Sequence, residues 1–115
     1  MAELKPNQAL DLWRNVLVET VRSAGPDLSA RQLAIVLTVY LTPPPHTVRG
    51  LAAKLGVTKP VITRALDTLG KYQLLARRRD ENDRRNVIVQ RTVKGALYVE
   101  RLGDIVVAKA AALPD

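Results

Sequence analysis

The 115-residue sequence contains no cysteine and no phenylalanine, and it has a single histidine. Without cysteine there can be no disulfide bond, no thiolate nucleophile and no cysteine-ligated metal site. A single imidazole, His46, also excludes a metal site built from several histidines. The two serines, Ser23 and Ser29, do not make a convincing catalytic triad with this histidine. The sequence therefore argues against an enzyme, and we expect no cofactor.

Long hydrophobic runs and targeting signals are missing as well. The longest apolar run, residues 33–41, is far shorter than the roughly 20 residues that a membrane-spanning helix needs. No apolar leader with a small-residue cleavage site precedes the first expected helix. We therefore expect no membrane partner, and a protein that stays in the cytoplasm where it is made.

Aromatic and acidic residues are both scarce. One tryptophan and three tyrosines are too few for the stacking platform of a single-strand-binding protein. The 18 basic residues outnumber the 11 acidic ones, for a net charge of +7. Twelve of the basic residues but only four of the acids lie between Arg49 and Lys94, so this segment carries +8 and the remainder −1. Such segregation favours contact with a phosphate backbone over general solubilisation.

Two segments that flank the basic region have the periodicity of long helices. They are residues 7–24 and 93–113, with Asn7 and Thr92 as candidate N-caps. Both apolar stripes are wider than one small core needs, so we expect these helices to pair with a second copy in a homodimer. The stripe of the first helix consists of Leu10, Trp13, Leu17 and Val21.

Three shorter helices are expected between these two. Ser29 is the candidate cap of a helix over residues 30–41, which we expect to form the buried centre. Within residues 47–71, two short helices meet at Gly56, a residue suited to the left-handed conformation that ends a helix. Two helices joined by a tight turn are typical of a helix-turn-helix. The candidate caps of this pair are Thr47 and Thr58.

After residue 71 the period of the apolar residues changes to two. Alternation on both sides of the polar loop at residues 80–85 predicts a β-hairpin over residues 74–91. The expected fold class is therefore mainly α with a small β-hairpin. We expect a winged helix-turn-helix (α+β) that forms a single domain over residues 1–115.

The second helix of the helix-turn-helix exposes polar and basic residues once its apolar stripe is placed inward. In helix-turn-helix docking the amino-terminal end of this helix enters the major groove. Arg64 can read guanine O6 and N7 or contact a phosphate, whereas Lys59 is assigned to a phosphate. Thr58 or Thr63 can meet a thymine methyl group or a phosphate. The predicted DNA contacts of this region are Thr47, Thr58, Lys59, Pro60, Thr63 and Arg64.

The loop of the hairpin supplies a second predicted contact. Arg84 and Arg85 carry planar guanidinium groups, which suit the negative potential of a narrow minor groove. Arg79 belongs to the same predicted DNA-binding set. Asp83 is expected to orient a neighbouring arginine through a bidentate pair. A loop whose charges are merely solvated is the alternative.

Four short segments carry the motifs of this region: residues 51–64 (LAAKLGVTKPVITR), 74–77 (LLAR), 83–85 (DRR) and 92–95 (TVKG). Together they resemble the winged helix-turn-helix of the MarR family of bacterial transcription regulators. The resemblance covers about residues 29 to 102. Its more specific parts are the Asp-x-Arg and Thr-x-Lys-Gly patterns at this spacing, because a helix-turn-helix alone fits many regulators.

The resemblance implies that residues 58–64 begin a recognition helix and that Arg84 and Arg85 belong to a DNA-contacting wing. It also implies a homodimer on a pseudo-palindromic site. The family usually has glycine where this chain has Gln73, so we expect a strained or differently built turn there. Family members commonly continue into further carboxy-terminal helices that complete the dimer and shape a ligand crevice. Here one helix ends near Leu113, which argues against a small-molecule effector.

The main prediction is a sequence-specific regulator, repressor-like, that binds double-stranded DNA. One alternative is an architectural or nucleoid-type protein, which would bind specific and random duplexes alike. Another is a winged helix used as a protein-interaction module, whose basic hairpin would meet an acidic partner. That module would bind no DNA at physiological salt.

Overall fold

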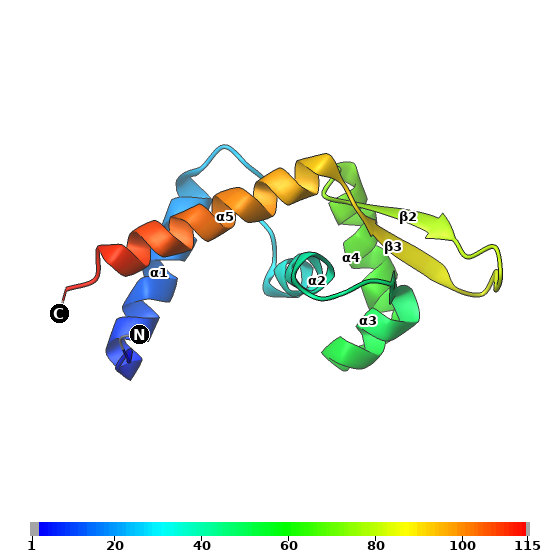
Figure 1. Ribbon diagram of the computed structural model, residues 1–115, viewed down its shortest axis with the longest axis horizontal. Helices are drawn as coiled ribbons and strands as arrows, with labels where there is room; N and C mark the ends of the chain where they lie inside the picture. The colour runs from blue at the N-terminus through cyan, green and yellow to red at the C-terminus, as the bar shows by residue number, and fades with distance from the viewer. Residues whose placement is uncertain (1–2, 115) are drawn as a thin grey trace. The chain divides into compact units, whose positions relative to one another are not determined.

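A computed structural model describes residues 3–114, which contain five helices and one three-stranded antiparallel sheet. The chain forms two compact units. One spans Leu28–Val99, and the other combines residues 3–27 with residues 100–114. Figure 1 shows the elements of both units, coloured from blue at the N-terminus to red at the C-terminus.

Two helices of the larger unit begin at the predicted cap residues. Ser29 precedes α2 (Ala30–Leu41), and its hydroxyl accepts a hydrogen bond from the backbone of Gln32. The Gln32 side chain accepts one from the Ser29 backbone in return, which completes a capping box. Thr47 caps α3 (Val48–Leu55) by accepting a backbone N–H bond from the first turn. Both caps are therefore confirmed.

The helix-turn-helix consists of α3 and α4 (Lys59–Lys71), joined at Gly56. Gly56 has φ 68°, in the left-handed region that favours glycine, as the sequence predicts. Thr58 occupies the N-cap position of α4, and Pro60 lies in the first turn, where a missing N–H costs little. However, the Thr58 side chain makes no capping hydrogen bond. The buried stripe of α4 is Ile62, Ala65, Leu66 and Leu69.

The predicted hairpin is present but belongs to a larger sheet. Strands β2 (Leu75–Arg79) and β3 (Val87–Arg91) pair antiparallel, with Arg77 opposite Val89. A third strand, β1 (His46–Thr47), pairs with the other edge of β3. The prediction of a hairpin alone was wrong on this point. A two-residue strand is too short to show alternation, and its partner lies about forty residues away in the chain.

Helix α2 forms the centre of the larger unit, as expected. Its residues Ile35, Val36 and Val39 are fully buried. They belong to one continuous apolar cluster that also takes side chains from α3, α4 and the sheet. The other buried members of this cluster are Val48, Leu51, Ala52, Ile62, Ala65, Leu66, Leu69, Leu74, Leu75 and Val89.

The turn between α4 and β2 is built around Gln73. This residue has φ 61°, and it is the one non-glycine residue with positive φ in the part of the chain described. The strained turn expected from the absence of glycine is therefore confirmed. The carbonyl oxygen of Gln73 accepts a hydrogen bond from the Thr92 hydroxyl at 2.7 Å. Thr92 also caps α5 (Val93–Ala111), because its Oγ1 accepts from the backbone N–H of Gly95 at 2.9 Å.

The smaller unit contains α1 (Pro6–Arg22) and the later part of α5. The N-cap of α1 is Lys5, whose N–H is bonded by the Gln8 side chain at 2.9 Å, so the assignment of the cap to Asn7 was wrong. Proline suits the first helical position because its fixed φ is helical and it needs no hydrogen-bond acceptor there. Lys109 of α5 forms an ion pair with Glu19 of α1 at 3.2 Å.

The predicted apolar stripe of α1 lies on the surface. Its four residues are between 41% and 66% exposed, whereas Val16 on the same helix is buried. Among residues 3–114, no helix is both long enough and apolar enough to cross a bilayer. Among residues 3–114, the side chains of this stripe are therefore left largely uncovered. It consists of Leu10, Trp13, Leu17 and Val21.

Candidate nucleic-acid interface

The outward face of α4 brings together most of the predicted major-groove residues. Its amino-terminal half exposes four of them side by side along the helix. The hydroxyl of Thr58, which does not cap the helix, stays available for an external acceptor. The helix dipole places partial positive charge at this same end, and that charge favours an anion such as phosphate. The four exposed residues are Lys59, Pro60, Thr63 and Arg64.

Thr47 is also a predicted DNA contact, but its side chain caps a helix. Its Oγ1 accepts the backbone N–H of Gly50 at 2.9 Å and so caps α3. The hydroxyl hydrogen can still be donated to a phosphate oxygen, because accepting one bond does not consume the donor. Thr47 therefore combines a cap with a candidate contact, whereas Thr58 is a candidate contact alone.

Arg64 lines a surface pocket of about 200 Å³ between α4 and the beginning of α2. Arg31 also lines this pocket, and neither arginine forms an ion pair with any residue from 3 to 114. Arg31 is not among the predicted DNA contacts, because it lies outside the basic segment and only the packing of α2 on α4 brings it to the same pocket as Arg64. The remaining lining residues are Ser29, Gln32, Val61, Ala65 and Thr68.

The loop of the wing, residues 80–86, is closed by its own backbone. Asp80 donates its N–H to the carbonyl of Asn86 at 3.1 Å, and Asn86 donates to the carbonyl of Asp83 at 2.9 Å. The Asp80 carboxylate accepts the N–H of Asn82 at 2.9 Å, as in an Asx turn. Two acidic residues of the loop thus serve as internal acceptors, which gives the loop a defined shape.

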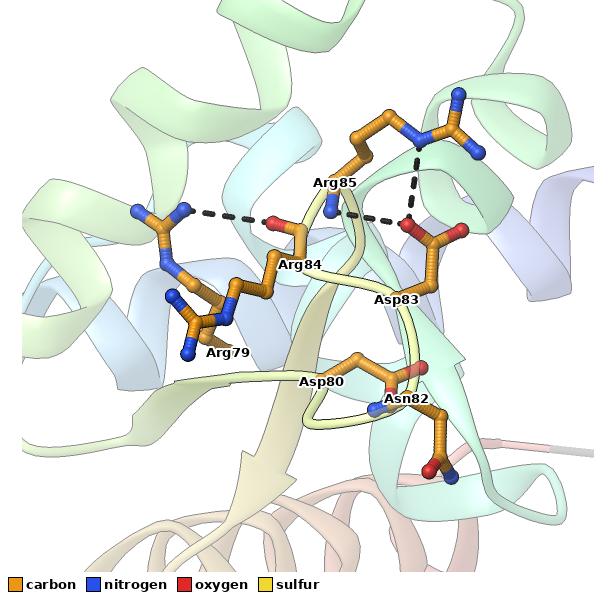
Figure 2. A network of polar contacts seen from close by, with 6 residues as sticks. All are labelled: Arg79, Asp80, Asn82, Asp83, Arg84 and Arg85. Atoms are coloured by element: carbon orange, nitrogen blue, oxygen red, sulfur yellow. Dashed lines mark hydrogen bonds and ion pairs between the residues drawn. The ribbon is translucent and has the colours of Figure 1, made fainter.

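Asp83 orients Arg85, although not through the expected bidentate pair. One carboxylate oxygen, Oδ1, accepts both the backbone N–H of Arg85 at 3.1 Å and its Nε at 3.2 Å. Figure 2 shows this fork and the Arg85 guanidinium extending away from the loop. The two terminal nitrogens of that guanidinium have no bonding partner among residues 3–114, and the side chain is 85% exposed. Asp83 therefore fixes the stem of the Arg85 side chain, while the end of its guanidinium is exposed to solvent.

Arg79 and Arg84 differ in what they contact. Arg79 Nη1 donates to the carbonyl oxygen of Arg84 at 3.3 Å, so it ties strand β2 to the far side of the loop (Figure 2). The Arg84 guanidinium has no ion-pair partner within residues 3–114. Arg79 is thus partly occupied in shaping the wing, and Arg84 offers an unpaired charge.

Two other arginines of the basic segment are committed to the fold. Arg77 Nη2 bonds Asp67 Oδ1 at 2.7 Å and so links β2 to α4. Arg91 donates to two carbonyl oxygens at the end of α2, those of Val39 and Thr42, each at 2.9 Å. The net charge of +8 already subtracts Asp67, the partner of Arg77, but it still counts Arg91, whose guanidinium is used within the fold.

The described residues hold no cluster of three or more histidine, cysteine or acidic side chains that could bind a metal ion. His46, the single histidine, lies in β1 and is half-buried. Its Nε2 lies 3.1 Å from the carbonyl oxygen of Thr42. The imidazole therefore helps to join the end of α2 to the edge of the sheet.

A family model described as "MarR family" matches residues 28–87 of the chain. Among solved structures, the YusO protein from Bacillus subtilis is similar with a TM-score of 0.75 and 21% identity, covering 91% of this chain and 73% of that one. At that identity the likeness shows the fold alone. None of the curated protein sequences matches.

Two further solved structures share more of the sequence. The transcriptional regulator BldR from Sulfolobus solfataricus is 29% identical with a TM-score of 0.63, over 89% of this chain and 73% of that one. A mutant of MarR from E. coli, complexed with operator DNA, is 26% identical with a TM-score of 0.69, over 91% and 71%. The winged helix-turn-helix expected from the sequence is thus the fold of these regulators.

Proposed function

Because the chain belongs to the MarR family, whose model matches more than half of its length, we propose that it is a sequence-specific transcriptional regulator that binds double-stranded DNA. It acts as a repressor-like protein that occupies promoter DNA, and it performs no catalysis. The observation that carries this proposal is the presence, in one compact unit, of an exposed polar and basic face on α4 and an arginine-tipped wing.

The proposed binding mode places α4 in the major groove. Arg64 reads a guanine edge, since a guanidinium can bond O6 and N7 together. Lys59 and Thr58, at the amino-terminal end of the helix, contact phosphates that fix the register of the protein on the duplex. Thr63 and Pro60 lie on the same exposed face and complete the contact with the groove.

The wing enters the neighbouring minor groove. Support comes from the geometry of its tip, where Asp83 anchors the stem of Arg85 while the terminal nitrogens stay free. A guanidinium that is already oriented loses less conformational entropy when it binds, which favours affinity. Arg84 adds a second charge at the tip that has no ion-pair partner within residues 3–114, and Arg79 holds the loop through its bond to the Arg84 carbonyl oxygen.

We further propose that two copies act together on a pseudo-palindromic site. The exposed stripe of α1 supports a homodimer through residues 7–24 and 93–113, because apolar side chains in contiguous rows are usually covered. The E. coli relative is known in complex with operator DNA. Two symmetric copies would present two recognition helices to two half-sites of one duplex.

The experiment that tests this function is binding to duplex DNA over a salt series. The protein first enriches a duplex from a pool of random sequences, and its affinity for that duplex is then compared with its affinity for an unselected one. We expect a preference of roughly 10³-fold or more, with log affinity falling linearly with log salt. Equal affinity for both duplexes would favour an architectural protein, and no binding near physiological salt would favour a protein-interaction module.

A pair of charge-matched variants locates the wing contact. Arg84→Ala/Arg85→Ala removes two cations from the wing, and Lys5→Ala/Arg22→Ala removes two exposed cations at the two ends of α1, neither of which belongs to its apolar stripe. The wing variant should bind more weakly and with a smaller salt slope, since fewer counterions are released. The α1 variant should bind as the wild type does. Equal effects of the two variants would count against a wing contact.

A further inference from the structure

One hydroxyl group joins three elements of the larger unit. Tyr40, in the last turn of α2, donates its Oη–H to the carbonyl oxygen of Leu74 at 2.7 Å. The same oxygen accepts the backbone N–H of Thr92 at 2.9 Å. Leu74 immediately precedes β2 and Thr92 immediately follows β3, so this hydroxyl bonds both ends of the wing hairpin to α2.

A second layer of contacts surrounds this hydroxyl. Thr92 Oγ1 bonds the carbonyl of Gln73 and the N–H of Gly95, which ties the turn after α4 to the start of α5. Gly95 is required here, because a Cβ at this position would overlap the Tyr40 hydroxyl and the carbonyl oxygen of Leu74. The side chain of residue 40 thus occupies the space that any side chain at residue 95 would need.

Arg91 anchors the end of β3 to the same helix. Its guanidinium donates to the carbonyls of Val39 and Thr42 and lies over the Tyr40 ring, with Cζ 5.9 Å from the ring centroid. Near the middle of the hairpin, the link from Arg77 to Asp67 of α4 is an exposed ion pair, a kind that contributes little in water. The contacts at the base therefore fix the direction of the wing together with the pairing of β1 along the middle of β3.

We propose that Tyr40 is a positioning residue for DNA binding: its hydroxyl sets the direction of the wing relative to α4, so that both elements engage one duplex. This inference rests on the proposed function. Tyr40 is not itself assigned a DNA contact. Without its hydroxyl, the Leu74 carbonyl and the Thr92 N–H lose a partner, and the base of the hairpin shifts to recover one. A strand of five residues spans about 16 Å, so a small tilt at the base becomes a larger displacement at the tip.

The test uses chemical footprinting that reports both grooves of one duplex. Dimethyl sulfate methylates guanine N7, which faces the major groove, and adenine N3, which faces the minor groove. The probe is the duplex that the wild-type protein enriches from random sequences. We expect Tyr40→Phe to keep the protection of guanine N7, to lose the protection of adenine N3, and to bind about fivefold to tenfold more weakly, the effect of one hydrogen-bonding group.

A second pair of variants tests the same contacts at the base of the hairpin through Thr92, whose N–H bonds the Tyr40 hydroxyl. Thr92→Val removes the hydroxyl that bonds Gln73 and Gly95, and Thr92→Ser keeps it. The valine variant should show the same selective loss of minor-groove protection, and the serine variant should behave as the wild type does. If Tyr40→Phe is unfolded at the assay temperature, as judged by circular dichroism, the Thr92 pair decides the question.

The wing variant separates positioning from a general loss of stability. In the Arg84→Ala/Arg85→Ala background, Tyr40→Phe should change the affinity less than about twofold, because interacting residues are not additive. A fivefold to tenfold loss in both backgrounds, equal loss of protection in both grooves, or no effect of either hydroxyl deletion would overturn the inference. A wild-type protein that enriches no duplex would instead refute the proposed function, and the positioning role with it.

Discussion

Gln73 holds a left-handed backbone conformation, φ 61°, that residues with a Cβ adopt at a cost. We expect Gln73→Gly to raise the free energy of unfolding by about 0.5 kcal/mol, since removal of the Cβ strain is partly offset by the greater freedom of glycine in the unfolded chain. Gln73→Val should lower it by about 1 kcal/mol or more, because a β-branched residue tolerates this conformation poorly. Urea denaturation measures both. Equal stability of the two variants would show that residue 73 does not hold a positive φ in solution.

Arg64 and Lys59 share one face of α4 but are assigned different contacts. Arg64→Ala should relax the preference for one base position by about 1–3 kcal/mol, because a bidentate contact to guanine is lost. Lys59→Ala should weaken binding to all sequences similarly and reduce the salt slope by about 1, as expected for a phosphate contact. Binding to a panel of single-base variants of the selected duplex, over several salt concentrations, measures both effects. The base-reading role of Arg64 is wrong if both variants weaken all duplexes alike.

At the scale of the elements, the two helices of the helix-turn-helix begin differently. Thr47 caps α3 through its hydroxyl, whereas Thr58 makes no such bond at the start of α4. Thr47→Ala should therefore lower the free energy of unfolding by about 1 kcal/mol. Thr58→Ala should change it by less than about 0.5 kcal/mol, the usual range for a surface substitution, yet weaken binding to DNA. Thermal unfolding and duplex binding of the two variants, measured together, check this contrast.

These measurements also distinguish helix capping from DNA contact, two roles that a threonine at an N-cap position can have. If Thr58→Ala destabilises the fold as much as Thr47→Ala, the hydroxyl caps α4 in solution and its DNA contact loses its main support. If Thr58→Ala changes neither stability nor binding, Thr58 is not part of the interface. Serine at either position provides the control, because it retains the hydroxyl and caps a helix as well as threonine does.

At the scale of the whole molecule, the exposed stripe of α1 predicts a dimer. Trp13→Glu/Leu17→Glu places two charges on this stripe and should produce a monomer of about 12.7 kDa, because burial of unpaired charges at an interface is costly. The affinity of this monomeric variant for the selected duplex should also be lower than that of the wild type, since the two half-sites are then bound by separate molecules. Light scattering after size exclusion measures the mass.

Leu41→Glu provides the control for this experiment. Leu41 is an apolar residue that is 69% exposed and lies outside the segments proposed to dimerise. This variant should keep both the mass and the affinity of the wild type. If the wild-type protein has the mass of a monomer and still prefers the selected duplex, the proposed dimer is wrong. Each copy would then recognise a single site.

Signals within a few neighbouring residues were enough to predict much of this protein. The caps at Ser29 and Thr47 and the left-handed turn at Gly56 are confirmed, because each depends on a side chain and the backbone beside it. The same local signals misplaced the start of α1. Asn7 is a good cap by residue type, but Pro6 just before it fits the first helical position better.

What the sequence left open depends on residues far apart in the chain. The pairing of β1 with β3, the approach of Arg31 to Arg64, and the bonds of Tyr40 to both ends of the hairpin join segments separated by more than thirty residues. Residue types set the charge and the order of the elements, because periodicity, caps and turns are local properties. Packing determines which arginines serve the fold and which stay free, because a hydrogen bond needs a partner that only the folded chain brings within 3 Å.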